Sequence, residues 1–366
     1  MILLVHNRYR TTGGEERAVS DLRWLIAEHM EEPVEVLERD SSQLGRARAA
    51  LGLLRGGLDP DDVSEAVRRT GARVVHAHNV NPAFGRRALE AARAAGARVV
   101  LHLHNYRLVC AVGTCFNSRG EDCVRCQGRD TLPGVRLNCR GTGPEAAVYA
   151  ASLALWQRRL AAQADAVVVP SRVAGERLRA LRAPLHPARV HVVPHVVRAF
   201  AERSRAAAGE HALVAARLAP EKGVDLAVQA CARAGLELVV AGDGPQADVL
   251  RAAGGARFVG RVSADELADL RARAALAIVP SRSAETFGLA AAEAMADGVP
   301  VVATAVGALP ELVGAEGLVA PGDVDALAAA ARARFGDEEA GRAGLERVRA
   351  LAAPAAVAGL LGPIYR

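Results

Sequence analysis

The sequence predicts an α/β protein made of two doubly wound domains, on three observations. Short apolar segments typical of buried strands alternate with amphipathic helical segments along the chain, and this alternation indicates parallel sheets. The length of 366 residues suits two domains of ordinary size, and the hydrophobic share of 51% supplies their cores. A polar, alanine-rich stretch at 198–210 interrupts the alternation and is expected to link the domains.

The first half of the chain begins directly on an expected strand. The residues from Glu15 to Glu28 follow it with leucine, valine and isoleucine at helical spacing. Residues 108–140 are irregular by comparison. The strands expected in this half lie at 2–6, 34–37, 74–76, 99–103, 166–169 and 190–195.

A second alternation of strands and helices begins after the linker. Each of its strands is a short apolar run bounded by glycine, proline or polar residues, which is typical of strands buried on both faces. The strands expected here lie at 212–216, 276–279 and 300–303, and a further one ends in the glycine turn that begins after Val239.

The positive charge of the chain comes almost entirely from arginine. Residues 1–200 carry 29 arginines against 20 acidic residues, whereas residues 201–366 carry 17 basic and 21 acidic residues, so the net +5 originates in the first half. A basic first domain could face an anionic acceptor or touch a membrane surface, although solvated arginines would give the same composition. Aromatic residues make up 3% and no nucleic-acid recognition motif occurs, which argues against nucleic acid as a partner.

The hydropathy pattern predicts a cytoplasmic protein. No uninterrupted apolar run reaches the roughly 18 residues that a membrane span needs. The chain opens on a strand rather than on a signal peptide.

The most informative stretch runs from Pro280 to Val302. Its first part is polar, and from Gly288 onward the residues are good helix formers until Gly298 and Pro300 end the helix. The amides of Phe287, Gly288 and Leu289 are therefore expected at a helix N-terminus, which favours anions. Gly288 would let a ligand approach the backbone closely.

Two carboxylates frame this turn, Glu285 in the loop and Glu293 about two turns along the helix. Carboxylates accept hydrogen bonds in pairs and so suit the hydroxyls of a sugar or a ribose. Two surface glutamates on an ordinary strand–loop–helix unit would look the same.

The stretch from Glu285 to Ala296, with seven residues between Glu285 and Glu293, resembles the donor-binding signature of the retaining glycosyltransferase family 4. The resemblance implies that Glu285 and the following amides hold the donor sugar and that Glu293 holds the nucleotide ribose. It also implies the GT-B fold, in which two Rossmann-like domains face a deep cleft. The expected domains are an acceptor-binding domain at 1–197, a nucleotide-sugar-binding domain at 198–350, and a tail at 351–366 that packs back on the first.

The loop from Arg217 to Gly223 contains Lys222, the one lysine among 46 basic side chains. A lysine ammonium is a compact point charge that suits phosphate, although a plain surface lysine is the alternative. The resemblance assigns Arg217 and Lys222 to the donor diphosphate. It also assigns three further positions to the surroundings of the nucleotide and its base: Gly242, Gly244 and Val262.

A pair of glycines, Gly13 and Gly14, follows the first strand in the segment that starts at Thr11. Paired glycines before a helix can bring the backbone up to a phosphate or a sugar, and a plain connecting turn is the alternative. The resemblance places this loop against the donor diphosphate and the acceptor.

Four histidines, His76, His78, His102 and His104, follow or end two strands of the first half. Ligands bind at the carboxyl ends of strands in open α/β sheets. Strand alternation predicts that His102 and His104 point to the same face. The resemblance favours His104 as the contact to the donor sugar, and at least one of the four is expected to be a packed core histidine.

The irregular residues 108–140 hold five of the six cysteines. Cys123 and Cys126 have knuckle spacing, and Cys110 and Cys139 flank them with twelve intervening residues on each side. These four could bind a structural zinc ion, while a disulfide and reduced thiols are the alternatives. A subset of the resembled family has a similar loop, at the place where an acceptor would arrive.

The resemblance implies a retaining, hexosyltransferase-like enzyme that moves a sugar from a UDP- or GDP-sugar to a small-molecule, glycan or lipid-linked hydroxyl. Its expected catalytic residues are His104, Arg217, Lys222 and Glu285. Protein cations and helix amides would stabilise the leaving diphosphate without a metal or other cofactor, since no Asp-x-Asp motif stands in a suitable loop. A GT-B nucleotide-sugar epimerase and a non-catalytic GT-B binding protein are the alternatives.

Overall fold

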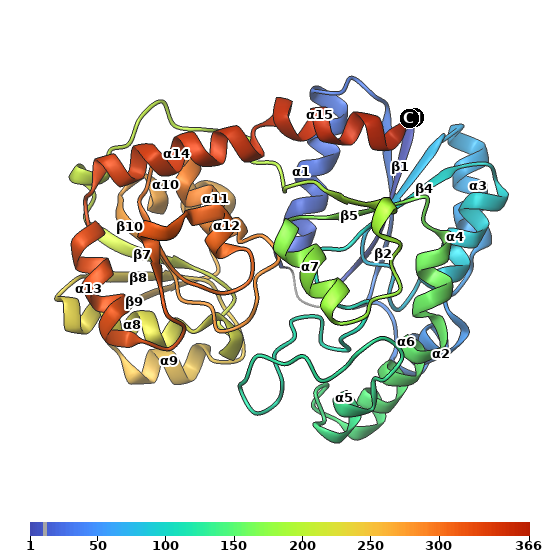
Figure 1. Ribbon diagram of the computed structural model, residues 1–366, viewed down its shortest axis with the longest axis horizontal. Helices are drawn as coiled ribbons and strands as arrows, with labels where there is room; N and C mark the ends of the chain where they lie inside the picture. Colours follow the sequence, from blue (N-terminus) through green and yellow to red (C-terminus); the bar gives the residue numbers. More distant parts are fainter. Residues whose placement is uncertain (10–12) are drawn as a thin grey trace. The chain divides into compact units, whose positions relative to one another are not determined.

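Two units, each with its own parallel sheet, make up the computed structural model, which describes residues 1–9 and 13–366 (Figure 1). Unit 1 consists of Met1–Val196 and Pro354–Arg366, and unit 2 consists of Val197–Ala353. Unit 2 begins at Val197, one residue before the expected start at 198. The returning tail begins at Pro354, three residues after the expected start at 351.

Unit 1 contains a six-stranded sheet in the order β2-β1-β3-β4-β5-β6, with all neighbours parallel. The order in which the chain adds strands to the sheet reverses between β1 and β3, which is the point where doubly wound sheets bind ligands. The strands are β1 (Ile2–Arg8), β2 (Val34–Asp40), β3 (Val74–Ala77), β4 (Arg98–His102), β5 (Ala166–Val169) and β6 (Val190–Val192). The helices are α1 (Gly14–Glu28), α2 (Arg46–Arg55), α3 (Asp61–Thr70), α4 (Gly85–Ala94), α5 (Leu132–Arg136), α6 (Gly143–Gln163), α7 (Arg172–Ala180) and α15 (Pro354–Tyr365).

Unit 2 repeats this plan with the order β12-β11-β10-β7-β8-β9 and a reversal between β7 and β10. The strands are β7 (His211–Ala215), β8 (Leu238–Ala241), β9 (Arg257–Gly260), β10 (Ala274–Val279), β11 (Val301–Thr304) and β12 (Leu318–Val319). The helices are α8 (Val224–Ala234), α9 (Ala247–Ala253), α10 (Ala264–Ala272), α11 (Leu289–Ala296), α12 (Leu309–Val313), α13 (Val324–Arg334) and α14 (Glu338–Ala352).

The apolar runs of the sequence form strands because both faces of each sheet are covered. In β1, Leu3 and Val5 pack into one hydrophobic cluster, while Ile2 and Leu4 pack into another. A strand buried on both faces has no polar side to alternate with, which explains its continuous run of apolar residues. The carboxyl ends of these strands are therefore held rigidly by the cores beneath them.

The expected linker at 198–210 packs along unit 2. The amide of Ala201 donates to the carbonyl of Ala296 at 2.8 Å, and the Ser204 hydroxyl donates to the carbonyl of Gly298 at 2.6 Å. These acceptors lie at the end of α11, where helix carbonyls have no partner within the helix. Residues of this stretch therefore donate hydrogen bonds to carbonyls at the C-terminal end of α11.

The helical stretch Glu338–Tyr365, which joins α14 and α15, is long and apolar enough by length and composition to cross a membrane. This stretch contains scattered charged residues, so it is not an uninterrupted apolar run. Core helices pass the same test, and several of its apolar side chains lie in the cores, among them Leu345 and Val348 of α14 and Val357 and Leu361 of α15.

Helix α15 packs on unit 1, beside α1 (Figure 1). Val357, Leu361, Ile364 and Tyr365 join the cluster formed by Ile2 and Leu4. The guanidinium of Arg98 donates to the carbonyl of Ile364 at 2.9 Å. The last helix of the chain thus completes the core of the unit that contains the first strand.

The packing of α15 predicts contrasting effects for two neighbouring leucines. Leu361 is 1% exposed and Leu360 is 45% exposed. We expect Leu361→Ala to lower the free energy of unfolding by about 2–5 kcal/mol, because it leaves a cavity in the core. Leu360→Ala should stay within about 0.5 kcal/mol of the parent. Urea unfolding of both variants measures this, and an equal effect of the two would contradict the packing of α15.

Candidate functional site

The loop after β7 places Lys222 against the end of β10. A single turn of 3-10 helix, Pro220–Lys222, ends at Gly223 with φ +63°. A Cβ atom at Gly223 would lie 2.1 Å from the carbonyl oxygen of Pro280, so only glycine allows this approach. The amide of Arg282 also donates to the carbonyl of Glu221 at 2.8 Å. The two loops on either side of the sheet reversal are thus joined.

An ion pair links Lys222 and Glu285 at this junction. The Lys222 Nζ atom lies 2.6 Å from Glu285 Oε1, and the Ser281 hydroxyl donates to the same oxygen at 2.7 Å. Burial alone would raise the pKa of Glu285, but the charge of Lys222 and the two hydrogen bonds outweigh it and hold the pKa below its usual value. The carboxylate is therefore ionised at neutral pH.

The second carboxylate oxygen, Glu285 Oε2, is available to a ligand. Both contacts of the carboxylate fall on Oε1, and among the described residues none is made to Oε2. The side chains of Lys222 and Glu285 remain 28% and 16% exposed. A carboxylate in a partly exposed side chain, held by contacts to its other oxygen, is suited to accept a hydrogen bond from a hydroxyl.

The backbone of Glu285 is fixed by the loop after β11. The amide of Ala308 donates to the carbonyl of Glu285 at 2.8 Å. Gly307 has φ +54°, and a Cβ atom there would lie 2.2 Å from that carbonyl oxygen. Sequence reasoning missed Gly307, because nothing in its local sequence shows that it meets Glu285. It also missed Ser281, which lies only four residues before Glu285.

Helix α11 starts at the predicted position behind Glu285. Gly288 is its N-cap with φ +97°, and Leu289 is its first residue. A Cβ atom at Gly288 would lie 2.8 Å from the side chain of Leu309, and the side chain of Phe287 is buried in the core. The glycine is therefore needed for packing against α12 as well as for the left-handed turn.

The glycines after β8 hold two loops together. Gly242 has φ +144°, and a Cβ atom there would lie 1.8 Å from the carbonyl oxygen of Ala216. A Cβ atom at Gly244 would lie 2.5 Å from that of Leu218. Both glycines thus bring the loop of Arg217 against the turn after β8. Val262 follows β9, the outermost strand, and packs on the core of unit 2.

The remaining charged residues predicted for unit 2 are engaged within the chain. Glu293 in α11 pairs with Arg271 of α10 at 3.1 Å, and Arg271 pairs with Asp297 as well. Arg217 pairs with Glu221. The structure therefore gathers Arg217, Lys222 and Glu285 around the joined loops, and places Glu293 further along α11 with a cation that the sequence did not reveal.

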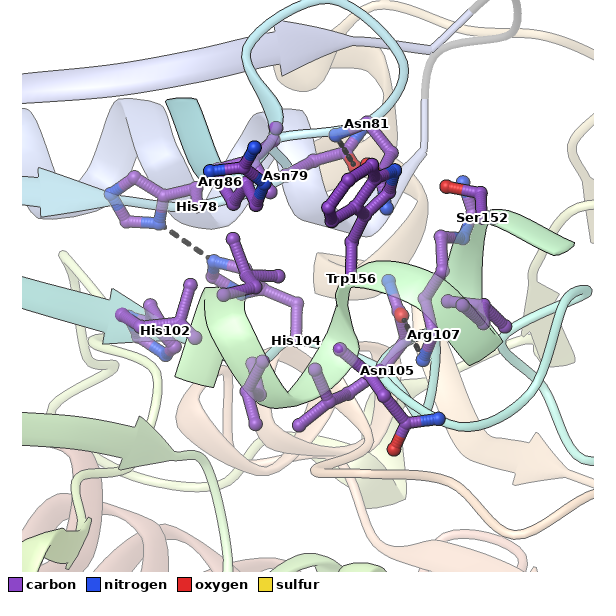
Figure 2. A pocket seen from close by; sticks show the side chains of 18 of the residues that line it. His78, Asn79, Asn81, Arg86, His102, His104, Asn105, Arg107, Ser152 and Trp156 are labelled. Atoms are coloured by element: carbon purple, nitrogen blue, oxygen red, sulfur yellow. Dashed lines mark hydrogen bonds between the residues drawn. The ribbon is translucent and has the colours of Figure 1, made fainter. Parts of the chain in front are cut away.

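His104 lies in unit 1, where it lines a pocket together with Asn105, Arg107 and Trp156 (Figure 2). The Nδ1 atom of His78 is hydrogen-bonded to Nε2 of His104 at 2.8 Å. The rings of His102 and His104 stack with centroids 4.0 Å apart, which confirms that they point to the same face.

Glu15, at the start of α1, also lines this pocket and was not predicted. The Tyr9 hydroxyl donates to its Oε2 atom at 2.8 Å and the Asn105 amide donates to it at 3.0 Å. Burial raises the pKa of Glu15 to about 7, although the bond from Tyr9 and the charge of Arg107 act against this. A carboxyl with this pKa exchanges its proton near neutral pH, as general acids and bases do.

The glycine pair lies at the start of α1. The amide of Gly13 donates to the Glu16 carboxylate at 2.7 Å, which satisfies a helix N-terminal amide within the chain. Gly14 is the first helical residue. Thr11 and Thr12 lie outside the described residues, so the predicted contact of this loop with a ligand stays a prediction.

The five cysteines of residues 108–140 line one pocket of unit 1: Cys110, Cys115, Cys123, Cys126 and Cys139. All are free thiols. The groups of ligand atoms that lie within 4.8 Å of one another in the described residues are formed by histidines and include none of these sulfurs. Zinc on Cys110, Cys123, Cys126 and Cys139 stays a prediction.

Comparison with known families gives the class of the protein. Residues 25–196 match the family described as "Glycosyl transferase 4-like domain", and residues 209–337 match "Glycosyl transferases group 1". The two matches together take in most of both units. The chain belongs to the GT4-type glycosyltransferases, as the signature around Glu285 predicted.

Individual relatives match a smaller part of the chain. Glycogen synthase of Mycobacterium tuberculosis is 40% identical over 159 residues, which are 38% of this chain and 37% of that protein. A GDP-mannose-dependent alpha-mannosyltransferase of Mycolicibacterium smegmatis is 35% identical over 182 residues, 45% of this chain and 44% of that protein. The chain thus spans less than half the length of these curated relatives.

Solved structures resemble the whole chain. Sucrose-phosphate synthase of Thermosynechococcus elongatus superimposes with a TM-score of 0.71 at 21% identity, over 100% of this chain and 98% of that chain. Anabaena HepE in complex with UDP and glucose gives a TM-score of 0.63 at 18% identity, over 99% and 98%. These similarities confirm the predicted GT-B fold with two Rossmann-like domains.

The environment of Glu15 predicts a pH effect on stability. Its raised pKa means that the folded chain binds this proton more tightly than the unfolded chain, so its contribution is complete below about pH 4.5 and is lost as the pH rises through about 7. We expect Glu15→Gln to gain stability over the parent between about pH 4.5 and pH 8, by on the order of 3 kcal/mol.

The matched control is Glu28→Gln, at an exposed position of the same helix. Its stability should stay within about 0.5 kcal/mol of the parent, as is usual for surface substitutions. Urea unfolding at a series of pH values gives both differences. A Glu15→Gln curve as flat as the control would show that Glu15 is not buried as described.

Proposed function

We propose that the protein transfers a sugar from a nucleoside-diphosphate sugar to a hydroxyl-bearing acceptor, with retention of configuration. Membership of the GT4-type glycosyltransferases supports the class of reaction. The observation that carries the proposal is the pair of Lys222 and Glu285 at the sheet reversal of unit 2. It puts a cation for phosphate and a carboxylate for a hydroxyl within one hydrogen bond of each other.

The pair can bind a donor without being broken. An ammonium group has three N–H donors, and Glu285 takes one of them. Two remain for oxygens of the diphosphate, while Glu285 Oε2 accepts a hydroxyl of the sugar. Diphosphate and sugar are adjacent in any donor of this class, as Lys222 and Glu285 are adjacent in the chain's fold.

The leaving diphosphate carries the charge that develops in the reaction. Lys222 is fixed by Glu285, Arg217 lies on the same loop, and α11 presents its N-terminus behind Glu285. Preorganised cations and helix amides stabilise such charge most when they need no rearrangement. We propose that Arg217, Lys222 and the amides from Phe287 to Leu289 serve this purpose.

The chemical step that we propose is a same-face substitution. The bond between the anomeric carbon and the phosphate oxygen breaks, a bond to the acceptor oxygen forms on the same face, and the acceptor proton passes to the leaving phosphate. Glu285 is occupied as a hydrogen-bond acceptor from Lys222 and Ser281, which suits it to hold the sugar rather than attack it.

We propose further that transfer needs no divalent cation, because protein cations take the place of the metal. Initial rates measured promptly after addition of a chelator should equal those without it, and added magnesium should not raise them. A rate that disappears with the chelator and returns with magnesium would contradict this part of the proposal.

The nucleotide base and the sugar can be found by screening. A relative is named for GDP-mannose and a structural neighbour was solved with UDP, so both nucleotides are candidates. A donor at a hundredfold excess over its Kd stabilises the protein by about 2.7 kcal/mol. A thermal-shift screen of UDP- and GDP-sugars should single out one donor.

Product analysis with that donor tests the reaction itself. A retaining transferase releases nucleoside diphosphate and forms a glycoside with an α-linkage from an α-linked donor, whereas a β-linkage would contradict retention. Release of nucleotide with an altered free sugar, independent of any acceptor, would indicate an epimerase instead. Binding without turnover over a broad acceptor panel would indicate a non-catalytic protein.

Unit 1 is the proposed acceptor-binding part. Its pocket combines polar groups such as Glu15, His104 and Arg107 with the apolar face of Trp156, a mixture that suits a glycan or a similar acceptor. Sugar contact by His104 and membrane contact by the arginines of this unit stay predictions. Vesicle co-sedimentation at low and high salt tests the second.

Removal of the sole lysine should abolish most of the activity. We expect Lys222→Ala to lose on the order of 2.7–4 kcal/mol of transition-state stabilisation, the cost of deleting one such contact. Lys222→Arg should recover only part of the rate, because the guanidinium is larger and planar. Steady-state kinetics with the donor measure both, and unchanged kcat/KM in Lys222→Ala would remove Lys222 from the mechanism.

Two carboxylates of unit 2 should have separable effects. Glu293→Gln should weaken binding of the bare nucleoside diphosphate, because Glu293 is assigned to the ribose. Glu285→Gln should spare nucleotide binding and lower turnover, because it touches the sugar that changes in the transition state. Calorimetric titration and turnover assays distinguish them.

Asp297→Asn is the control for Glu293→Gln. Both variants remove a carboxylate partner of Arg271, but only Glu293 is assigned to the nucleotide. Asp297→Asn should therefore bind nucleotide like the parent. If Glu285→Gln and Glu293→Gln both bind and turn over like the parent, the assignment of this pair to the donor fails.

A further inference from the structure

Six of the ten histidines of the chain form one cluster within unit 1. They lie in or just after four strands of its sheet: His6, His76, His78, His102, His104 and His195. Their rings form a chain of contacts, such as His76 on His78 at 4.6 Å and His104 on His195 at 5.1 Å between centroids. Such a concentration of imidazoles in a core is unusual, because histidine is only moderately suited to burial.

Three of these side chains have the geometry of a metal-binding site. His76, His78 and His102 each offer one ring nitrogen, and the three nitrogens lie within 4.8 Å of one another. All three residues are buried. They extend from the neighbouring strands β3 and β4, which fix their backbone positions; Figure 2 shows His78 and His102 beside each other.

The hydrogen bonds of this triad leave nitrogens without partners. His76 uses Nδ1 for the Tyr365 hydroxyl at 2.6 Å, and His78 uses Nδ1 for His104 at 2.8 Å. Nε2 of His76, Nε2 of His78 and both nitrogens of His102 are buried without a hydrogen-bond partner in the described part of the chain. Buried polar atoms are nearly always satisfied, so these nitrogens call for a ligand.

We propose that His76, His78 and His102 bind one divalent zinc ion. Imidazole nitrogens suit zinc among the common metals, and three histidines with an open fourth position are an established zinc coordination. Tyr365 and His104 would hold the outer nitrogens of His76 and His78, as second partners of ligating histidines do. This site is separate from Lys222 and Glu285 and does not rest on the proposed transfer reaction.

The protonation state favours metal binding. Burial lowers the pKa of His76 to about 3, and burial followed by neighbouring histidines holds those of His78 and His102 well below the usual value. These imidazoles are therefore neutral at pH 7, and neutral imidazole is the form that binds metal.

A second triad and the cysteines are the competing sites. His102, His104 and His195 also bring nitrogens within 4.8 Å of one another, and they share His102 with the first triad. The pocket of the five cysteines offers thiolates, which bind zinc strongly. The experiment must therefore distinguish three sets of ligands.

The test uses the full chain without a histidine tag, purified under reducing conditions and stripped of metal. Cobalt(II) serves as the spectroscopic probe and zinc as its competitor. We expect one cobalt per chain with visible ligand-field bands and no thiolate-to-cobalt charge-transfer band, and displacement of cobalt by zinc. X-ray absorption of the zinc form should show nitrogen and oxygen but no sulfur neighbours.

Variants then locate the site. His102→Gln and His76→Gln should lose the cobalt bands. Tyr365→Phe should weaken binding about 10–100-fold, as loss of a second partner does. His195→Gln and the double variant Cys123→Ser/Cys126→Ser should keep the parent spectrum and affinity. Circular dichroism checks that each variant is folded.

Three results would overturn the proposal. They are sulfur neighbours in the X-ray absorption of the parent, failure of the stripped parent to bind cobalt or zinc, and a folded His76→Gln that binds like the parent. The first two results are measured on the parent protein, so they decide the outcome even if a variant fails to fold.

Discussion

The ion pair between Lys222 and Glu285 is the interaction on which the proposed donor site depends. It joins residues 63 positions apart, from loops on either side of the sheet reversal in unit 2. Two glycines make it possible, because Gly223 lets the Lys222 loop touch Pro280 and Gly307 lets the next loop touch Glu285. The ammonium is thereby positioned before any ligand arrives, which is the condition for effective electrostatic stabilisation.

Unit 1 concentrates its polar groups in a different way. Glu15 and the histidines are buried at the carboxyl ends of strands, and burial shifts the pKa of Glu15 to about 7 and that of His76 to about 3. Titratable groups with shifted pKa values cluster at functional sites. Burying such groups lowers stability, and proteins accept this cost where the groups serve binding or chemistry. The same sheet thus carries the pocket that we propose for the acceptor and a cluster of neutral imidazoles.

Local sequence was sufficient for most strands of the fold, although not for the two-residue strand β12. Strands such as β1 and β10 are short apolar runs, and their burial on both faces follows from helices that the sequence also shows by periodicity. The stretch from Glu285 to Glu293 placed the loop and α11 correctly, because loop, N-cap glycine and helix formers are adjacent in the chain.

Partners that come from distant segments could not be predicted. Gly307 meets Glu285, Arg271 meets Glu293, and Asn105 meets Glu15 only once the sheets are assembled. The same holds for the polar stretch at 198–210, whose hydrogen bonds to the end of α11 cannot be read from its composition. The sequence suggests ligand contacts for glycines near the predicted site. In the structure, Gly242 and Gly288 are needed for close contacts within the chain, because a Cβ atom at either would clash with a neighbouring segment.

The sole lysine allows a direct measurement on the proposed donor site. In a tag-free chain labelled with nitrogen-15 at lysine Nζ, Lys222 gives the one ammonium signal in the spectrum. Titration with the nucleoside diphosphate of the preferred donor should shift this signal saturably, with the same Kd as calorimetry, because the ammonium gains phosphate oxygens as partners. A signal that stays unchanged while the nucleotide saturates the protein would contradict the central claim that Lys222 binds the donor diphosphate.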